Sequence, residues 1–232
     1  MITKENKVEL ISYFGGDSTH ASPVHDYIDE NEPDTNRRNR LLKILIENNE
    51  LECFRNSFLQ FKLITDYTTF INFNKKLEGY NIVPEIYSHK YPSEYDFYIP
   101  MDLGEFPSKA DIKLGDEEKT IFEGGTNWWN ILYDYNELGL RIHKQMLKDL
   151  DMKLPSPRIR DLSKFTQTLG AQVIYTINFS WLTFYNFYIE AMKPTTQLEF
   201  HDIAEDMMSL VEEIPYKPFK NTIKYFNINE TK

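Results

Sequence analysis

The chain has 232 residues, of which 41% are hydrophobic and 15% aromatic. It has enough core-forming side chains to fold and is unlike a disordered protein, and because no linker is evident we predict one domain over residues 1–232. The formal net charge of −10 excludes a global positive field of the kind that draws proteins to nucleic acids or anionic lipids. We therefore expect neither a nucleic-acid nor a membrane partner.

Cysteine content and the N-terminal residues predict the compartment. The one cysteine, Cys53, cannot form an internal disulfide, and no Cys/His set has metal-ligand spacing, so a reducing compartment and no metal are expected. Residues 1–7 lack the apolar run of a signal peptide, and no stretch approaches the roughly 18 apolar residues of a membrane helix. We predict a cytoplasmic protein with Cys53 as a core thiol. The abundance of Asn, Lys, Ile, Tyr and Phe is typical of an AT-rich genome, and a viral origin would mean the host cytoplasm.

The first 36 residues predict a strand followed by a loop. Residues 8–14 are apolar and β-favouring, and two glycines end the run. Residues 17–36 are polar and acidic and predict an exposed loop. A metal site is the alternative reading of this segment, because carboxylates and imidazoles gather in it at His20, His25, Asp26, Asp29 and Glu30.

A helix, a strand and a second helix are predicted next. In residues 40–47 the pairs Leu41/Leu45 and Leu42/Ile46 place apolar groups four residues apart, which is typical of a helix with one buried side, and Asn48-Asn49 ends it. Residues 59–63 alternate with period two and predict a half-buried strand. Asp66 is then expected to cap a helix whose buried side carries Phe70, Phe73 and Leu77.

The middle of the chain is harder to assign. Four prolines interrupt residues 80–125, for which we predict a loop-rich insertion with one short extended segment at 95–99. Apolar residues at steps of three and four from Thr126 to Leu150 predict helix, with Gly139 as a candidate break between two helices. Two local patterns keep alternative readings: residues 124–127 are a tight turn or a phosphate-binding helix start, and Trp128-Trp129 are core residues or a stacking platform.

Two helices are predicted in the C-terminal part. Apolar residues from Leu169 to Ile189 predict a long helix with a wide apolar surface, buried at a subunit interface or inside the domain. Thr196 and Glu199 match a capping box for the final helix. Its buried stripe comprises Phe200, Ile203, Ala204, Met207, Val211 and Ile214, and Pro215 and Pro218 end it. His143 and His201 lie on predicted helices with no nucleophile nearby in sequence, and we expect both at the surface or an interface.

Several stretches together resemble one family. They are Thr176-Ile177-Asn178, Leu182-Thr183-Phe184 and Thr196-Gln197-Leu198-Glu199-Phe200, with weaker matches at 41–47 and 58–61. They are similar to flavin-dependent thymidylate synthases, in which a Thr-x-Asn segment opens a long helix and Ala-Gln-x-Glu-Ile opens the last one. The resemblance implies an α+β fold with a mixed sheet wrapped by helices and a homotetramer with shared active sites. It also implies dUMP as the pyrimidine nucleotide, with FAD, NADPH and methylene-tetrahydrofolate as reactants.

The chain departs from the family at its arginine motif. Where the family has Arg-His-Arg and then Ser-x-Arg-Tyr, this sequence has Asn74-Lys75-Lys76 and Ser93-Glu94-Tyr95. A lysine keeps the charge but lacks the planar fork of guanidinium. The nucleotide-binding residues that the resemblance then suggests are Lys75, Lys76, Ser93, Tyr95, Gln197 and Arg55. The cofactor-binding residues are Asn178 and the cluster Arg37, Arg38 and Arg40, which is otherwise a solvated junction among acidic residues.

Three interpretations of this departure remain open. The chain is a divergent enzyme that transfers a one-carbon unit, by methylation or hydroxymethylation, to C5 of a pyrimidine nucleotide. Alternatively it is a catalytically inactive homologue that acts as a structural or interaction protein, or the resemblance is accidental. No catalytic residue is assigned by any of them.

Overall fold

The computed structural model of the chain describes residues 5–22, 34–76, 81–84, 96–114, 119–150, 153, 155, 158–159, 162 and 164–230. These divide into two compact units. Unit 1 comprises residues 1–5, 65–71 and 85–173, and unit 2 comprises 6–64, 72–84 and 174–232. Whether the two act as one domain stays a prediction. No described helix is long and apolar enough to cross a membrane.

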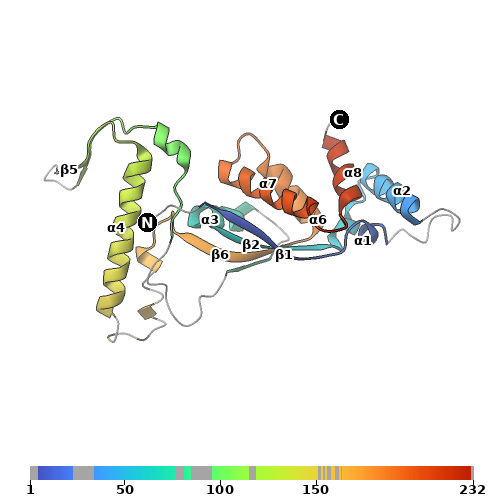
Figure 1. Cartoon of the computed structure of the whole chain (residues 1–232), viewed down its shortest axis with the longest axis horizontal. Coiled ribbons are helices and arrows are strands. Elements are labelled where there is room, and N and C mark those ends of the chain that lie inside the picture. The colour runs from blue at the N-terminus through green and yellow to red at the C-terminus, as the bar shows by residue number, and fades with distance from the viewer. Residues whose placement is uncertain are drawn as a thin grey trace. The chain divides into compact units, whose positions relative to one another are not determined.

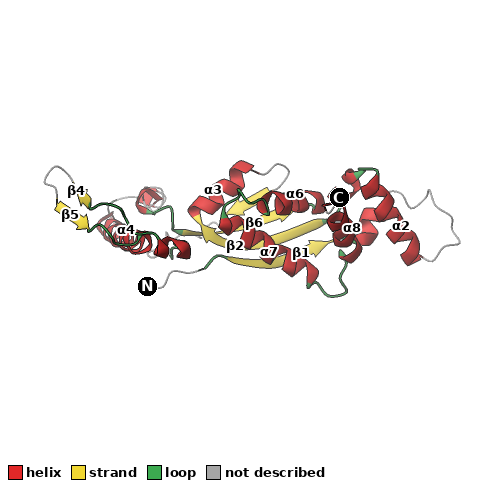
Figure 2. Cartoon of the chain, turned by 90° about the horizontal axis from the view of Figure 1, so that it is seen from above, coloured by secondary structure: helices red, strands yellow, loops and turns green. Residues whose placement is uncertain are grey.

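The main feature of unit 2 is a four-stranded sheet in the order β1-β2-β6-β3 (Figures 1 and 2). Its strands are β1 (Lys7–Phe14), β2 (Phe58–Asp66), β3 (Asn81–Pro84) and β6 (Gln172–Phe179). β1 runs antiparallel to β2, and β3 antiparallel to β6. β2 and β6 also run in opposite directions, because Tyr67 bonds to Ala171 at one end while Gln60 bonds to Asn178 at the other. The sheet of described strands is therefore antiparallel, and the expected mixed sheet is wrong; alternation in the sequence indicates strands but not their direction.

One face of this sheet is covered by α3 (Tyr67–Lys76), α6 (Trp181–Ala191) and α7 (Leu198–Glu212), as Figure 1 shows. Aromatic side chains join the layers: Phe73 lies 5.2 Å from Phe187 and 4.7 Å from Phe200 between ring centroids. Phe61 on β2 lies 5.7 Å from Phe184 on α6. These side chains are almost fully buried. Because burying one large apolar side chain stabilises a fold by about 1.5–3 kcal/mol, this face is the main core of unit 2.

A helical cluster completes unit 2 and contains α1 (Asp17–Ala21), α2 (Asp34–Glu47), the 3-10 helix η2 (Leu51–Arg55) and α8 (Lys220–Glu230). Asp17 joins its first and last members. The Asp17 carboxylate accepts from the backbone N–H groups of Asn221 at 3.0 Å and Thr222 at 2.8 Å, and so caps the start of α8. The Thr222 hydroxyl donates to Asp17 at 2.8 Å and lies 3.0 Å from Nδ1 of His20.

Unit 1 is built around one helix, α4 (Trp128–Leu150). Asn127 accepts from the N–H of Asn130 at 2.9 Å and so begins it, and Gly125 has φ +94° in the turn before it. The unit also contains a hairpin of β4 (Ile112–Leu114) and β5 (Lys119–Phe122) and the 3-10 helices η3 (Met101–Glu105) and η4 (Lys164–Thr166). Residues 124–127 thus form a tight turn at a helix start, as one of the two readings predicted.

Most predicted elements of the N-terminal half are confirmed. β1, α2 and β2 cover the predicted segments, and Asp66 caps α3 by accepting from the N–H of Thr69 at 2.9 Å. The loop prediction for 17–36 missed α1 and the first three residues of α2. In the proline-rich segment 80–125, the structure adds β3, η3 and a hairpin to the expected loops, and Phe97 in the predicted extended segment forms a β-bridge with Ala171.

Three expectations for the C-terminal half are wrong, and one helix was missed. Residues 172–179 form a strand, whose residues Tyr175, Ile177 and Phe179 point into the core at every second position. Gly139 does not break α4, which runs without interruption because a single glycine costs a helix only about 1 kcal/mol. The capping box is displaced: α7 begins after Gln197, and the Thr196 hydroxyl bonds to the carbonyl of Glu190 instead. α8 was not predicted.

The histidines and Cys53 also differ in part from expectation. His143 is fully buried, with Nδ1 2.7 Å from the Thr166 hydroxyl, whereas it was expected at the surface. The His201 side chain is 39% exposed, which confirms its surface position. Cys53 is half-buried rather than a core thiol. Of the two tryptophans, Trp128 is exposed and Trp129 stacks on Tyr133 with ring centroids 5.3 Å apart.

Candidate functional site

The amino end of α7 lies beside α3 in unit 2. Asn72 on α3 donates through Nδ2 to Oε1 of Gln197 at 3.1 Å, and the rings of Phe73, one residue after Asn72, and Phe200, three residues after Gln197, pack together. Gln197 immediately precedes the helix, and its side chain makes no capping hydrogen bond. The first backbone N–H groups of a helix have no partner within the helix and carry a partial positive charge. This end of α7 therefore favours negative charge, and the buried acid Glu199 already lies in its first turn.

The two candidate lysines follow Asn72 on the same helix. Lys75 and Lys76 are the last two residues of α3, three and four positions after Asn72. The structure thus brings Gln197 and the segment that carries both lysines to the same α3/α7 junction. Ser93 and Tyr95, the other predicted nucleotide contacts from the middle of the chain, lie outside the described residues, as does Glu94.

A row of polar side chains crosses the other face of the sheet. Ser12 on β1 donates to Oε1 of Gln60 on β2 at 3.0 Å, and Nε2 of Gln60 donates to Oδ1 of Asn178 on β6 at 3.0 Å. Asn81 on β3 pairs directly opposite Asn178. We call these four residues the polar row. Their side chains are exposed or partly exposed. Carboxamides provide both donors and acceptors, and so can match the alternating carbonyl and N–H groups of a uracil or flavin ring edge.

The α3/α7 junction and the polar row lie on opposite faces of the sheet. Phe73 on α3 contacts Tyr175, whose side chain lies on the covered face of β6. Asn178, an odd number of residues away, points to the other face because successive strand residues alternate. One copy of unit 2 therefore does not bring Gln197 and Asn178 to a common ligand.

The remaining predicted cations are in the helical cluster. Arg55 on η2 is half-exposed and its Nε lies 2.9 Å from a carboxylate oxygen of Glu52. Arg37, Arg38 and Arg40 are on α2, which packs against α1 and α8. Arg37 is buried there. The described contacts join none of these four residues to the polar row or to the α3/α7 junction, and their role in ligand binding stays a prediction.

Fit to a flavin can be tested on the polar row. The Nδ2 group of Asn178 is not used in its bond to Gln60, since that bond uses Oδ1. A donor is therefore available beside the exposed Asn81 amide, as a ring carbonyl requires. The arginines on α2 do not fit the same ligand from this chain, because they belong to a different part of the unit. The residues present thus suit the ring edge of a flavin but do not supply the charges for its phosphates.

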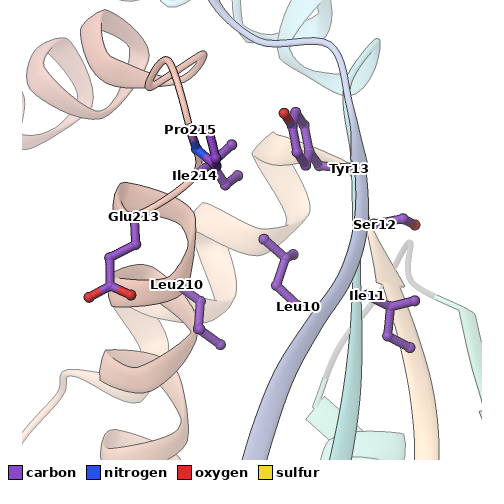
Figure 3. A pocket seen from close by; sticks show the side chains of 8 residues that line it. All are labelled: Leu10, Ile11, Ser12, Tyr13, Leu210, Glu213, Ile214 and Pro215. Atoms are coloured by element: carbon purple, nitrogen blue, oxygen red, sulfur yellow. The ribbon is translucent and has the colours of Figure 1, made fainter.

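Two hollows on the described surface of unit 2 lack the chemistry of a nucleotide site. A hollow of about 530 Å³ next to η2 is lined by two acids, Glu50 and Glu52, and by no cation. It also contains Cys53, whose pKa burial raises to about 11. Little of this thiol is ionised at neutral pH, so Cys53 is a poor nucleophile. The second hollow, also about 530 Å³, lies between β1 and α7 and has Glu213 as its one charged residue (Figure 3).

Comparison with known proteins identifies the fold. No family model matches the sequence, and no protein with a curated description matches it. Among solved structures, 107 chains match. One is a UMP/dUMP methylase, PolB from Streptomyces cacaoi, bound with 5-Br UMP; it has 14% sequence identity and a TM-score of 0.64 over 97% of this chain and 94% of that one. The two chains share a fold. At this identity the likeness concerns the α+β architecture and not the reaction.

Sequence reasoning missed four of the residues at these two places. Asn72, Ser12, Gln60 and Asn81 were not singled out, and neither was the role of Asn72 in holding Gln197. Gln60 carried a usable signal, since it is a polar residue at an alternate position of a predicted strand beside apolar neighbours. Ser12 and Asn81 carried none, because only strand pairing brings them into line with Asn178.

Proposed function

We propose that the chain binds a pyrimidine nucleotide of the UMP or dUMP type and transfers a one-carbon unit to C5 of its ring. The observation that supports this most is the similarity in fold, over almost the full length of both chains, to a UMP/dUMP methylase. The α3/α7 junction adds a local reason: α3, whose last two residues are Lys75 and Lys76, is joined to the start of α7 by the Asn72–Gln197 hydrogen bond, and cationic residues suit the one phosphate of such a nucleotide.

In this proposal Lys75, Lys76 and the amino end of α7 hold the phosphate, and the bond from Asn72 orients Gln197. The polar row, with Asn178 at its centre, holds the ring edge of FAD. The flavin, when bound, supplies the two electrons that turn a transferred methylene group into a methyl group, with methylene-tetrahydrofolate as donor and NADPH as reductant. The chain contributes binding and orientation, which alone can account for several kcal/mol of barrier lowering.

The opposite placement of the two parts favours an assembly. The phosphate contacts and the ring contacts lie on different faces of one sheet, so the junction of one copy and the polar row of another would have to complete each site. A homo-oligomer, such as the tetramer that the resemblance implies, satisfies this requirement. An assembly also covers the exposed apolar side chains on the open face, among them Phe14 and Val83.

An inactive homologue is the second candidate. It is favoured by a specific observation: the arginines that the family uses to hold phosphates are replaced, and the described arginines of unit 2 lie on α2 and η2 instead. A chain that kept the fold and lost these contacts would serve as a structural or interaction partner.

Titration calorimetry with dUMP and with deoxyuridine separates the two candidates. We expect dUMP to bind the wild-type chain, and the double variant Lys75→Ala/Lys76→Ala to bind dUMP at least about tenfold more weakly, since each lost charged hydrogen bond costs about 1.5–3 kcal/mol. Deoxyuridine lacks the phosphate, and its affinity should be unchanged by the double substitution. Lys109→Ala, at an exposed lysine of unit 1, is the matched control. Absence of dUMP binding at millimolar concentration contradicts the enzyme proposal and leaves the inactive homologue.

A further inference from the structure

Strand β1 has an open edge. It is the first strand in the sheet order, and of the described strands only β2 pairs with it. In an edge strand, every second backbone N–H and C=O points away from the sheet and can pair with another chain. Proteins commonly protect such an edge with charges or prolines, yet the second half of β1 is Ile11, Ser12, Tyr13 and Phe14. Its three large apolar side chains are exposed by 47%, 42% and 64%.

A groove runs beside this half of β1. Its walls are residues 10–13 of β1 and the carboxyl end of α7 with the turn after it, from Leu210 to Pro215. Figure 3 shows Leu10 and Leu210 facing one another across it, with Tyr13 near Ile214 at the upper end. The register shift between Leu10 and Ser12 places Ile11 in a bulge, on the far side of the strand from α7. The groove is thus apolar inside and is bordered by unpaired backbone.

The groove has one acid on its rim and further acids along the helix that leads to it. Glu213 lies on its rim, and the exposed side of α7 continues with four more acids and no lysine or arginine: Asp202, Glu205, Asp206 and Glu212. Burial, and then repulsion by the charges of Asp202 and Glu205, raises the pKa of Asp206, while Nδ1 of His201 lies 3.8 Å from a carboxylate oxygen of Asp202 and of Glu205. A positively charged partner would relieve this repulsion.

We propose that the groove binds an extended peptide segment with alternating apolar and basic side chains, which pairs with the open edge of β1 as an additional strand. Backbone pairing supplies affinity in this mode of recognition, and pockets for alternate side chains supply specificity. The apolar side chains of the segment would lie between Leu10 and Leu210, and its basic side chains would lie near Glu213. Since Leu210, the first groove residue of α7, lies 13 positions after Gln197, or about 20 Å at 1.5 Å per residue, this surface is distinct from the nucleotide site.

A synthetic peptide of alternating lysine and valine, as long as β1 and labelled for fluorescence anisotropy, is the probe. Two derivatives carry N-methyl groups on alternate backbone amides, one set on each edge of the extended peptide. We expect one derivative to bind like the parent and the other to bind at least about tenfold more weakly, because a lost backbone hydrogen bond costs about 1 kcal/mol and several are lost together. Equal affinity of the two derivatives overturns strand pairing.

Charge variants test the place of binding. Glu213→Lys should weaken the lysine/valine peptide about fivefold, as expected for reversing one rim charge. Glu212→Lys changes the charge equally at an exposed neighbour that does not line the groove, and it should have a smaller effect. Equal effects of the two variants would mean non-specific attraction to α7 and would contradict the proposal. A peptide of alternating glutamate and valine should not bind.

Self-association is the competing use of this edge. Sedimentation of the full chain with and without the lysine/valine peptide distinguishes the two. If β1 pairs with β1 of a second copy, the peptide finds no open edge in the assembled form, and its anisotropy does not rise. That result overturns the peptide proposal, whereas peptide binding to a chain of unchanged mass supports it.

Discussion

Replacing the buried Asp17 should destabilise the fold more than replacing any of the surface acids described in unit 2. The Asp17 side chain is 7% exposed and accepts four hydrogen bonds, two from Asn221 and two from Thr222. In Asp17→Ala, water can reach the partly buried Asn221, but Thr222 is fully buried: its N–H loses its acceptor, and its hydroxyl keeps only Nδ1 of His20 as a partner. Each orphaned buried donor costs about 1–3 kcal/mol, so we expect a loss of about 3 kcal/mol in the free energy of unfolding. Asp17→Asn keeps one oxygen and should lose about half as much.

Urea unfolding followed by tryptophan fluorescence measures this loss. Trp181 is fully buried and stacks on Phe219 with ring centroids 5.4 Å apart, in the same cluster as the Asp17 network, so its emission reports the region concerned. Asp134→Ala, at an exposed acid on α4, is the control and should change stability by less than about 0.5 kcal/mol. A loss for Asp17→Ala no larger than that of the control would refute the assignment of Asp17 as the cap of α8.

Three further predictions concern the same unit. Burial among Phe54, Trp181 and Phe219 lowers the pKa of His20 from 6.5 to about 4. The neutral side chain therefore contributes its full stability above pH 6.5, and the free energy of unfolding should fall by about 3 kcal/mol as the pH is lowered toward 4. In His20→Gln this part of the pH dependence should disappear, and an unchanged pH profile of the free energy of unfolding would contradict the prediction. Gly16 has φ +141° and a Cβ there would lie 2.5 Å from the Pro218 carbonyl oxygen, so Gly16→Ala should lower the midpoint of thermal unfolding by an amount that corresponds to about 2–4 kcal/mol, and a neutral result would exclude this close approach. Ser180 caps α6 by accepting from the N–H of Thr183 at 3.2 Å, and Ser180→Ala should cost about 1 kcal/mol in urea unfolding while Ser180→Asp retains stability; equal losses would argue against the cap.

Local patterns predicted the elements whose stability depends on local contacts. The Leu41/Leu45 and Leu42/Ile46 pairs predicted α2, and Asp66 was found as the cap of α3 because a cap acts on a residue only three positions away. The interpretation of 172–179 as helix failed because apolar residues on both sides of the segment satisfy a helical period as well as a strand period. The stricter signal was the alternation of Tyr175, Ile177 and Phe179 with Thr176 and Asn178.

Contacts between segments that are far apart in the chain could not be predicted from local sequence patterns. The burial of His143, which was expected at the surface or an interface, was missed because its hydrogen-bond partner Thr166 lies 23 residues away in the sequence. α8 was missed because the acceptor that begins it, Asp17, is 204 positions before Asn221. The candidate site has the same character: the resemblance suggested Asn178 and Gln197, but only the pairing of four strands and the contact from Asn72 show that they lie on opposite faces.

Release of hydrogen from C5 of the nucleotide tests the proposed reaction most directly. dUMP labelled with tritium at C5 would be incubated with the purified chain, FAD, NADPH and methylene-tetrahydrofolate, and tritium in water would be counted. We predict release that requires the folate donor and falls at least about tenfold in Lys75→Ala/Lys76→Ala, as for a phosphate contact, but not in Lys109→Ala. If dUMP binds and no tritium is released from either dUMP or UMP, the chain is an inactive homologue and the proposed C5 transfer is wrong.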